Sequence, residues 1–388
     1  MTPLTTFLRD RLLAEGSMPF SSFMAEALYH PGQGYYATRR LRTGRGGDFF
    51  TSVSVGPVFG QIMAGEFCAA WERMGRPGRF TVIEAGANDG QFAFDVLSWL
   101  RAHRPDFLEV LTYQIDEPLA PIASIQRETL KDFQAVVSHD AVGRSAHGCY
   151  FANEVLDAIP CRRVRFTGGG WQELHVGLDA DQQFCWEARE AQDETLKNRL
   201  AWLGNDFPEG YTTEIAPSVV SHLQHAAARL EQGYWFFADY GYAARDYYAP
   251  HRLTGTLRCY RDHRAHDDPF DAIGETDLTA HVDFSLAAST AVESGCQVMA
   301  FLDQARFLTA AAADTLRRME QETPLVGTPW QRQFQTLTHP AHLGQKFHFL
   351  VLGKNVEDCP LPASLAFARS AAVEDLLLAT SAPLDDES

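Results

Sequence analysis

The stretch VIEAGANDGQF at residues 82–92 decides the fold. Its apolar start predicts a strand that begins at Phe80, and Gly86 and Gly90 predict a tight turn after that strand. A helix is expected to begin near Asp89, because apolar residues then recur at helical spacing as far as Leu100. A strand, a turn and a helix in this order form the building unit of a parallel α/β sheet.

Further apolar runs that end in polar or acidic residues follow along the chain. They are VLTYQIDE (110–117), FQAVVSHD (133–140), GCYFANE (148–154), GYWFFADY (233–240), GCQVMAF (295–301) and KFHFLVLG (346–353). Several of them precede sequence that is compatible with a helix, which favours a doubly wound arrangement. We therefore expect a Rossmann-like α/β fold with a seven-stranded sheet, which is the sheet of class I methyltransferases.

The remaining segments predict additions to this core. Residues 1–77 are expected to form an N-terminal helical cap and an active-site loop, and residues 78–355 the core. Insertions after the fourth and fifth strands are expected at about 161–212 and 242–282, and a C-terminal helix and tail at 356–388. The chain is thus predicted to be one core with insertions, since no internal repeat is visible.

Composition excludes some classes of partner. Lys and Arg total 33 against 50 acidic residues, and a net charge of -17 argues against binding nucleic acid or anionic membranes. A basic partner and simple solubility both remain as explanations of the charge. The seven cysteines are scattered without a CxxC pair, and no segment is typical of a signal peptide or a membrane span. We therefore expect a cytoplasmic location, and the scattered histidine pairs predict no metal site.

The turn and the next strand end predict an adenosine site. Glu84 ends the first strand before the glycine turn, and Glu117 ends the second strand, where a carboxylate can bind ribose hydroxyls. Asp140 ends the third strand, within reach of an adenine amino group. A dinucleotide enzyme would need GxGxxG to hold a pyrophosphate, and GANDGQ lacks it, whereas S-adenosylmethionine has no phosphate. A nicotinamide-dependent oxidoreductase is therefore the weaker alternative, and a merely structural turn remains open.

A second polar group follows the fourth and fifth strands. NEVLDAIP supplies Asn153, Glu154 and Asp157, and FADYGY supplies Asp239 and Tyr240. Methyl transfer requires the acceptor nitrogen to be oriented in line and its charge to be held, and a carboxylate such as Glu154 can bind a guanidinium bidentately. The structural alternatives are that Asn153 caps a following helix and that FADY ends in an ordinary turn.

The motifs together resemble the MidA family, whose mitochondrial members assist assembly of respiratory complex I. The resemblance is carried by LYHPGQGYY, GRGGDFFTS and VFG before the core, and then by IEAGANDG, YQIDEP, ANEVLDAIP, FADYGY, GTLRCYRDH, GETDLTAHVDFS and QARFL. It implies a class I methyltransferase fold with S-adenosyl-L-methionine as methyl donor. For the mitochondrial relatives it implies symmetric dimethylation of an arginine in a complex I subunit.

The resemblance also implies roles for individual residues. The predicted cofactor-binding residues are Gly47, Asp48, Thr51, Ser52, Glu84, Gly86, Asn88, Gly90, Glu117, Asp140 and Asn153. The predicted catalytic residues, on the acceptor side, are Asn153, Glu154, Asp157, Asp239, Tyr240 and His281. For His281 a packed histidine competes with a general base, and Asp283 is expected to cap a helix that begins near Phe284.

One departure from the family pattern leaves two functions open. Asn88 stands where the family has the middle glycine of its turn, and its side chain lies beside the expected donor. The first hypothesis is an active protein-arginine methyltransferase. The alternative is a non-catalytic assembly or chaperone-like protein that retains the fold. The expected partners are a protein substrate and, by the resemblance, a respiratory-complex subunit, and a homodimer is left open.

Overall fold

The decisive stretch forms the expected unit. In the computed structural model, which describes residues 2–38, 51–140, 143–261, 264–313, 315–317, 328–359, 365 and 371–381, strand β2 (Phe80–Ala85) runs into the glycine turn. Helix α5 (Gln91–His103) begins directly after Gly90, whose φ of 84° is left-handed. Glycine adopts this conformation without steric cost, which explains why the helix can begin so soon after the strand.

The main sheet has the order β15-β16-β10-β5-β2-β3-β4. Its strands are β3 (Leu111–Asp116), β4 (Val137–Ser138), β5 (Ser145–Asn153), β10 (Leu230–Tyr242), β15 (Gln297–Asp303) and β16 (Phe347–Lys354), besides β2. The pairs from β10 to β4 are parallel, whereas β16 is antiparallel to both of its neighbours. The Rossmann-like α/β prediction is confirmed, and the two-residue β14 (Val282–Asp283) adds an eighth strand beside β10.

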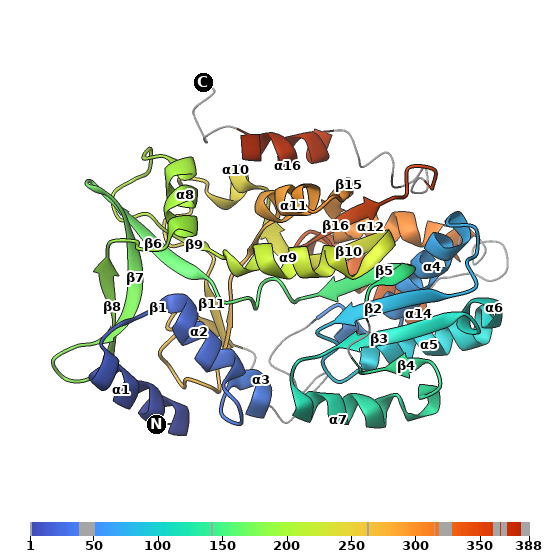
Figure 1. Ribbon diagram of the computed structural model, residues 1–388, viewed down its shortest axis with the longest axis horizontal. Helices are drawn as coiled ribbons and strands as arrows, with labels where there is room; N and C mark the ends of the chain where they lie inside the picture. The colour runs from blue at the N-terminus through green and yellow to red at the C-terminus, as the bar shows by residue number, and fades with distance from the viewer. Residues whose placement is uncertain are drawn as a thin grey trace.

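Helices cover both faces of this sheet (Figure 1). One face carries α4 (Val58–Arg73), α5, α12 (Gln304–Ala311) and α14 (Pro329–Thr338), and the other carries α9 (Ser218–Ala228), α11 (Phe284–Glu293) and α16 (Ala371–Ser381). Successive residues of a strand point to opposite faces of the sheet. Val82 therefore packs against the helical layer that contains α4 and α5, and Ile83 packs against the layer that contains α9 and α11. Both are fully buried, which explains the continuous apolar run in the sequence.

A second sheet is built from the first insertion and the N-terminus. It has the order β1-β7-β6-β9, with β8 beside β7. The strands are β1 (Met18–Pro19), β6 (Arg162–Thr167), β7 (Gly170–Leu178), β8 (Phe184–Arg189) and β9 (Thr212–Ile215), and α8 (Glu194–Leu203) follows β8. The second insertion adds a small sheet of β11 (Arg258–Arg261), β12 (Arg264–His266) and β13 (Asp277–Thr279).

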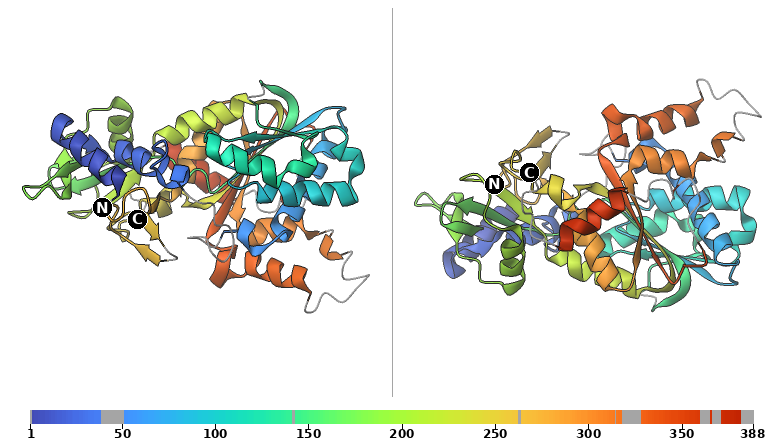
Figure 2. Two further views of the ribbon diagram at one scale, coloured as in Figure 1. Left: turned by 90° about the horizontal axis from the view of Figure 1, so that it is seen from below. Right: turned by 90° about the horizontal axis from the view of Figure 1, so that it is seen from above.

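The N-terminal helices pack against these insertions. Helices α1 (Pro3–Glu15), α2 (Phe20–Tyr29) and α3 (Tyr35–Thr38) share one apolar cluster with Cys161, Val176 and Leu278 from the two insertions. We call α1–α3, β6–β9 and β11–β13 the insertion lobe, and Figure 2 shows it at one end of the molecule. Residues 1–77 thus contribute to two bodies, because α4 packs on the main sheet with α5.

Short segments complete the described chain. They are the helical turns Val53–Val55, Pro105–Leu108 (α6), Lys131–Phe133, Ala244–Tyr247 (α10) and Pro340–Gly344, together with α7 (Ala120–Thr129) after β3. Helix α11 begins at Phe284, and the Asp283 carboxylate accepts the N–H groups of Ser285 and Leu286, so the predicted cap is confirmed. Within the described ranges, no helix is both long and apolar enough to span a bilayer.

Candidate active site

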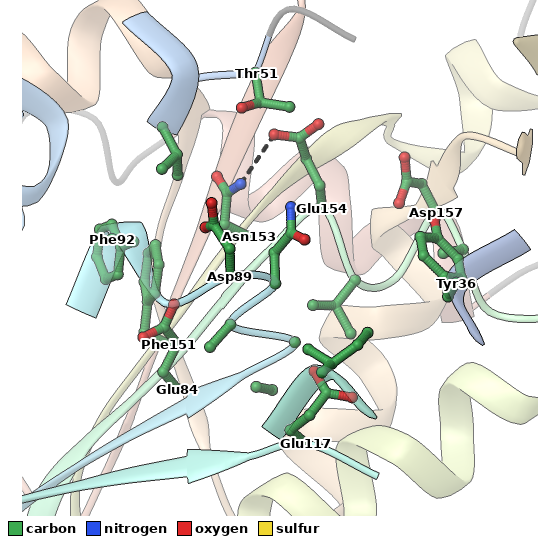
Figure 3. A pocket seen from close by; sticks show the side chains of 18 of the residues that line it. Tyr36, Thr51, Glu84, Asp89, Phe92, Glu117, Phe151, Asn153, Glu154 and Asp157 are labelled. Carbon is green, nitrogen blue, oxygen red and sulfur yellow. Dashed lines mark hydrogen bonds between the residues drawn. The ribbon is translucent and has the colours of Figure 1, made fainter. Parts of the chain in front are cut away.

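A cavity of about 790 Å³ lies at the carboxyl edge of the main sheet. Its walls come from the ends of β2, β3 and β5, from α2, α3 and β13 of the insertion lobe, and from Thr51, Val53, Ser54, Gly56 and Pro57. In open α/β sheets ligands bind at this edge, because the loops that follow parallel strands meet there. Figure 3 shows polar side chains around the cavity, among them Tyr36 of α3, Glu84 of β2, and Glu117 and Glu154, which follow β3 and β5.

The glycine turn brings backbone to the wall of the cavity. Gly86 has a φ of 64°, and a Cβ atom added there would lie 2.8 Å from Cγ2 of Val155. Asn88 is also left-handed, with a φ of 49°, and its carbonyl oxygen accepts a 2.9 Å hydrogen bond from Nε2 of Gln126. Asparagine tolerates this conformation better than most side chains do. The departure from glycine at Asn88 therefore leaves the turn intact.

Two carboxylates border this turn. The Tyr113 hydroxyl donates a 2.6 Å hydrogen bond to Oε2 of Glu84, and burial raises the pKa of Glu84 to about 8 despite that bond. Oε1 of Glu117 accepts the N–H of Leu119 at 3.0 Å, and burial likewise raises the pKa of Glu117. Both residues line the cavity from neighbouring strand ends, as expected for groups that bind an adenosine moiety.

Three other predicted cofactor-binding residues, Ser52, Gly90 and Asp140, do not reach the cavity wall. Ser52 is fully buried and its hydroxyl donates to Oε1 of Gln304, so it faces α12. Gly90 packs near Leu130, and Asp140 is exposed. Gly47 and Asp48 lie outside the described residues. Thr51 does line the cavity, next to a turn closed by its own hydrogen bonds with Ser54.

The loop after β5 presents its polar side chains to the cavity. Glu154 has a left-handed φ of 53°, and its Oε1 accepts a 2.9 Å hydrogen bond from Nδ2 of Asn153. Burial, the carboxylate of Asp157 and that of Asp277 raise the pKa of Glu154 to about 8. The loop runs from Glu154 to Pro160 without a helix, so the alternative that Asn153 caps a helix is wrong. Such backbone strain in a non-glycine residue is typical of functional loops.

Asp239 supports this loop from behind. Its Oδ2 accepts the backbone N–H groups of Val155, Leu156 and Asp157, and its Oδ1 accepts that of Tyr240. Asp239 is buried and is not among the residues that line the cavity. Its geometry therefore suits positioning of the loop that carries Glu154.

Tyr240 and His281 close one side of the cavity. Their rings stack at 6.2 Å between centroids, and the Tyr242 ring lies 5.3 Å from that of His281. Burial and, to a smaller extent, the cations of Arg252 and Arg258 lower the pKa of His281 to about 4. An imidazole with such a pKa is a weak base at neutral pH, so the geometry favours the packed histidine.

Several residues of the cavity were missed in the sequence. They are Tyr29, Tyr36, Asp89, Phe92, Asp116, Tyr260 and Asp277. Tyr29 and Tyr36 lie in the quoted N-terminal motif and Asp277 lies in GETDLTAHVDFS, so the motifs themselves were the available signal. Their place in the cavity depends on packing between distant segments.

The residues present fit S-adenosylmethionine. Gly86 has no side chain, so a ligand can approach its backbone closely. The carboxylate of Glu117 retains lone pairs that can accept hydrogen bonds from ribose hydroxyls. Oδ1 of Asn153 is buried without a hydrogen-bond partner, and Asn153 lines the cavity, which suits an ammonium donor such as the amino group of the methionine moiety. When bound, the sulfonium compound supplies an activated methyl group.

The sheet order, the turn and the carboxylates define an S-adenosyl-L-methionine-dependent methyltransferase. A model of the family described as "Putative S-adenosyl-L-methionine-dependent methyltransferase" matches residues 62–302. The chain belongs to this family, and S-adenosyl-L-methionine is its cofactor.

Solved and curated relatives agree with this assignment. A Burkholderia thailandensis protein solved with S-adenosyl-homocysteine bound is 33% identical, with a TM-score of 0.84 over 95% of each chain. The mitochondrial protein arginine methyltransferase NDUFAF7 homolog of Drosophila melanogaster is 28% identical over 89% of this chain and 83% of its own. Human NDUFAF7, a mitochondrial protein arginine methyltransferase, is 24% identical over 91% and 83%. The family resemblance is therefore confirmed.

The expected cytoplasmic location is contradicted by these relatives. The NDUFAF7 proteins of fly, mouse and human are named as mitochondrial. The prediction depended on the scattered cysteines, all seven of which are free thiols in the structure, and on the lack of a segment typical of a signal peptide or a membrane span. Free thiols indicate a reducing compartment, and they do not distinguish the cytoplasm from another reducing compartment.

Proposed function

We propose that this methyltransferase transfers a methyl group to an arginine side chain of a protein substrate. The observation that carries the proposal is the half-buried Glu154 carboxylate, which faces the cavity where the Asn153 side chain also lies (Figure 3). A carboxylate in a site that excludes water binds a guanidinium strongly, through two parallel hydrogen bonds. The relatives named as protein arginine methyltransferases support the same acceptor.

The chain's own residues would orient the acceptor and accept its proton. A bond forms between a guanidinium nitrogen and the methyl carbon while the sulfur–carbon bond breaks and its electron pair returns to sulfur. The nitrogen then loses one proton. Glu154, whose pKa of about 8 is close to neutrality, is placed to bind the guanidinium and to take that proton.

The donor end would be held by the residues around the turn. Glu84, Gly86, Asn88 and Glu117 line this part of the cavity, and Asn153 lies between it and Glu154. A respiratory-complex subunit as substrate remains a prediction from the resemblance, and a homodimer remains open.

The proposal is tested with purified protein, methyl-labelled S-adenosylmethionine and a peptide that contains one arginine. Label transfer to the arginine, located by mass spectrometry, is expected for the wild type. Glu154→Gln should slow transfer by about 100-fold or more, because it removes both the charge and the proton acceptor. The dissociation constant for S-adenosylhomocysteine should stay within about threefold, since Glu154 lies on the acceptor side.

A matched control separates this effect from a loss of surface charge. Glu293→Gln removes the same charge from an exposed position at the end of α11 and should leave transfer unchanged. Equal loss of transfer and of donor binding in Glu154→Gln would place Glu154 on the wrong side of the site.

A further inference from the structure

Residues 51–57 form one wall of the donor part of the cavity. Five of them line it, namely Thr51, Val53, Ser54, Gly56 and Pro57. They lead into α4, where a Cβ atom added at Gly60 would lie 2.7 Å from Cβ of Asp95 on α5, and Asp95 also lines the cavity. Because α5 begins at the glycine turn, this close approach of the two helices places residues 51–57 beside that turn. Figure 3 shows Thr51 on the same side of the cavity as Asn153 and Glu154.

Hydrogen bonds close this wall into a turn. The N–H of Thr51 donates to Oγ of Ser54 at 2.9 Å, and the N–H of Ser54 donates to Oγ1 of Thr51 at 3.1 Å. The hydroxyl of Ser54 also donates to the carbonyl of Thr51 at 2.8 Å. Ser52, inside this turn, is fully buried and does not line the cavity. A contact that holds Ser52 therefore holds the whole turn.

Gln304 makes that contact. Its Oε1 accepts the Ser52 hydroxyl at 2.9 Å, and its Nε2 donates to the carbonyl of Leu337 at 2.9 Å. Gln304 is fully buried at the start of α12, and Leu337 lies in α14. Both polar ends of the buried amide are thus satisfied. The amide joins three segments of the chain that are distant in the sequence.

A second glutamine, in α14, contacts the same wall. Oε1 of Gln333 accepts the N–H of Val58 at 3.3 Å. Gly56 has a φ of 136°, and a Cβ atom added there would lie 2.6 Å from the side-chain amide of Gln333. Helices α12 and α14 therefore support residues 51–57 at both ends of the segment.

We propose that Ser52 and Gln304 are positioning residues for donor binding, which hold residues 51–57 against the site of S-adenosylmethionine. The inference goes beyond the proposed function, because it concerns the donor and does not depend on the acceptor. It also gives two of the motifs a shared role, since Ser52 belongs to GRGGDFFTS and Gln304 belongs to QARFL. A wall that is held in place before the donor arrives costs less free energy to order on binding.

The first measurement is calorimetric titration of each full-length variant with S-adenosylhomocysteine. Ser52→Ala should weaken binding by about three- to fivefold, because the turn loses its hydroxyl anchor. Gln304→Met keeps the length of the side chain and loses both hydrogen bonds, so it should weaken binding by about tenfold or more. The double variant should bind as Gln304→Met does, since the two residues act through one hydrogen bond.

The matched control is Asp303→Ala, at the neighbouring position. Asp303 accepts the N–H of Arg306 at 2.8 Å and caps α12, so this change weakens the helix and keeps the contact between Ser52 and Gln304. Its affinity for S-adenosylhomocysteine should equal that of the wild type.

Amide hydrogen exchange of the free protein locates the change. A general loss of stability affects both variants, whereas release of the turn affects Gln304→Met alone. The N–H of Ser54 should therefore exchange about tenfold faster or more in Gln304→Met than in Asp303→Ala. If Gln304→Met does not fold, the same comparison of exchange and affinity is made with Ser52→Ala.

Three results would overturn the inference. Unchanged affinity in Gln304→Met shows that residues 51–57 contribute nothing to donor binding. Equal exchange at Ser54 and equal loss of affinity in Gln304→Met and Asp303→Ala show a general loss of stability only. Additive losses of affinity in the double variant show that Ser52 and Gln304 act separately.

Discussion

Oδ2 of Asp239, at the end of β10, accepts the backbone N–H of Leu156 at 2.9 Å. The same atom accepts the adjoining N–H groups of Val155 and Asp157 at 3.2 Å and 3.3 Å. One buried carboxylate thus holds three consecutive residues of the loop that carries Glu154. The neighbouring strand therefore determines where Glu154 lies in the cavity.

Asp239→Asn should disturb this loop. An amide has one acceptor oxygen, so its NH₂ group would face either the three loop N–H groups or that of Tyr240. We expect the free energy of unfolding to fall by about 2 kcal/mol and kcat to fall more than donor affinity does. Denaturant unfolding, methyl transfer and calorimetry measure these quantities. Asp246→Asn, an exposed change nearby, is the control, and unchanged kcat in Asp239→Asn would contradict the positioning role.

Glu117→Ala should act on the donor instead of the acceptor. It removes the carboxylate placed to accept ribose hydroxyls and the cap on the N–H of Leu119. We expect S-adenosylhomocysteine to bind about tenfold or more weakly in calorimetric titration, because two hydrogen bonds to a charged group are lost. Glu128→Ala, an exposed change on α7, should bind normally. Retained affinity in Glu117→Ala would remove this residue from the ribose site.

Asn88→Gly tests whether asparagine, which stands where the family has a glycine in this turn, weakens donor binding. Asn88 already adopts the left-handed conformation that glycine would adopt. We therefore expect the affinity for S-adenosylmethionine to change by less than about threefold. A large gain in affinity would instead indicate a decayed site and favour the non-catalytic hypothesis. Asn88→Val, which puts a β-branched residue at a positive φ, should lower the free energy of unfolding by about 1–2 kcal/mol.

Glu154→Gln should make stability less dependent on pH. The folded pKa of about 8 lies above the ordinary value of 4.5, so the stability contributed by the protonated carboxyl is complete below pH 4.5 and is lost as the pH rises through 8. Glutamine does not titrate. The difference in free energy of unfolding between the variant and the wild type should therefore be about 3–4 kcal/mol larger at pH 8 than at pH 5, in favour of the variant.

Denaturant unfolding at these two pH values measures the gain. Glu293→Gln should show no comparable difference between them, since that residue is exposed. If the free energy of unfolding of Glu154→Gln differs from that of the wild type by the same amount at pH 5 and at pH 8, Glu154 is ionised in the folded protein throughout this range.

Periodicity and motif spacing predicted most of the main sheet. Val82 and Ile83 are apolar because each faces a different helical layer, and this double burial is visible in the sequence as an unbroken apolar run. The strand-end positions of Glu84, Glu117 and Glu154 were predicted because each follows such an apolar run. Ligand sites in these folds lie at the carboxyl ends of parallel strands. The direction of each side chain was not predictable, and Ser52 and Asp140 accordingly lie off the cavity wall.

The sequence by itself determined the class of fold, the donor turn and the family. These depend on local patterns: alternation along a strand, helical spacing after Gly90, and motifs in a set order. Only the tertiary structure decided that Tyr36 and Asp277, 241 residues apart, meet at the cavity wall and that Asp239 lies behind it. The physical reason is that apolar packing of α1–α3 against both insertions brings these segments together, and such long-range burial leaves no periodic trace in the chain.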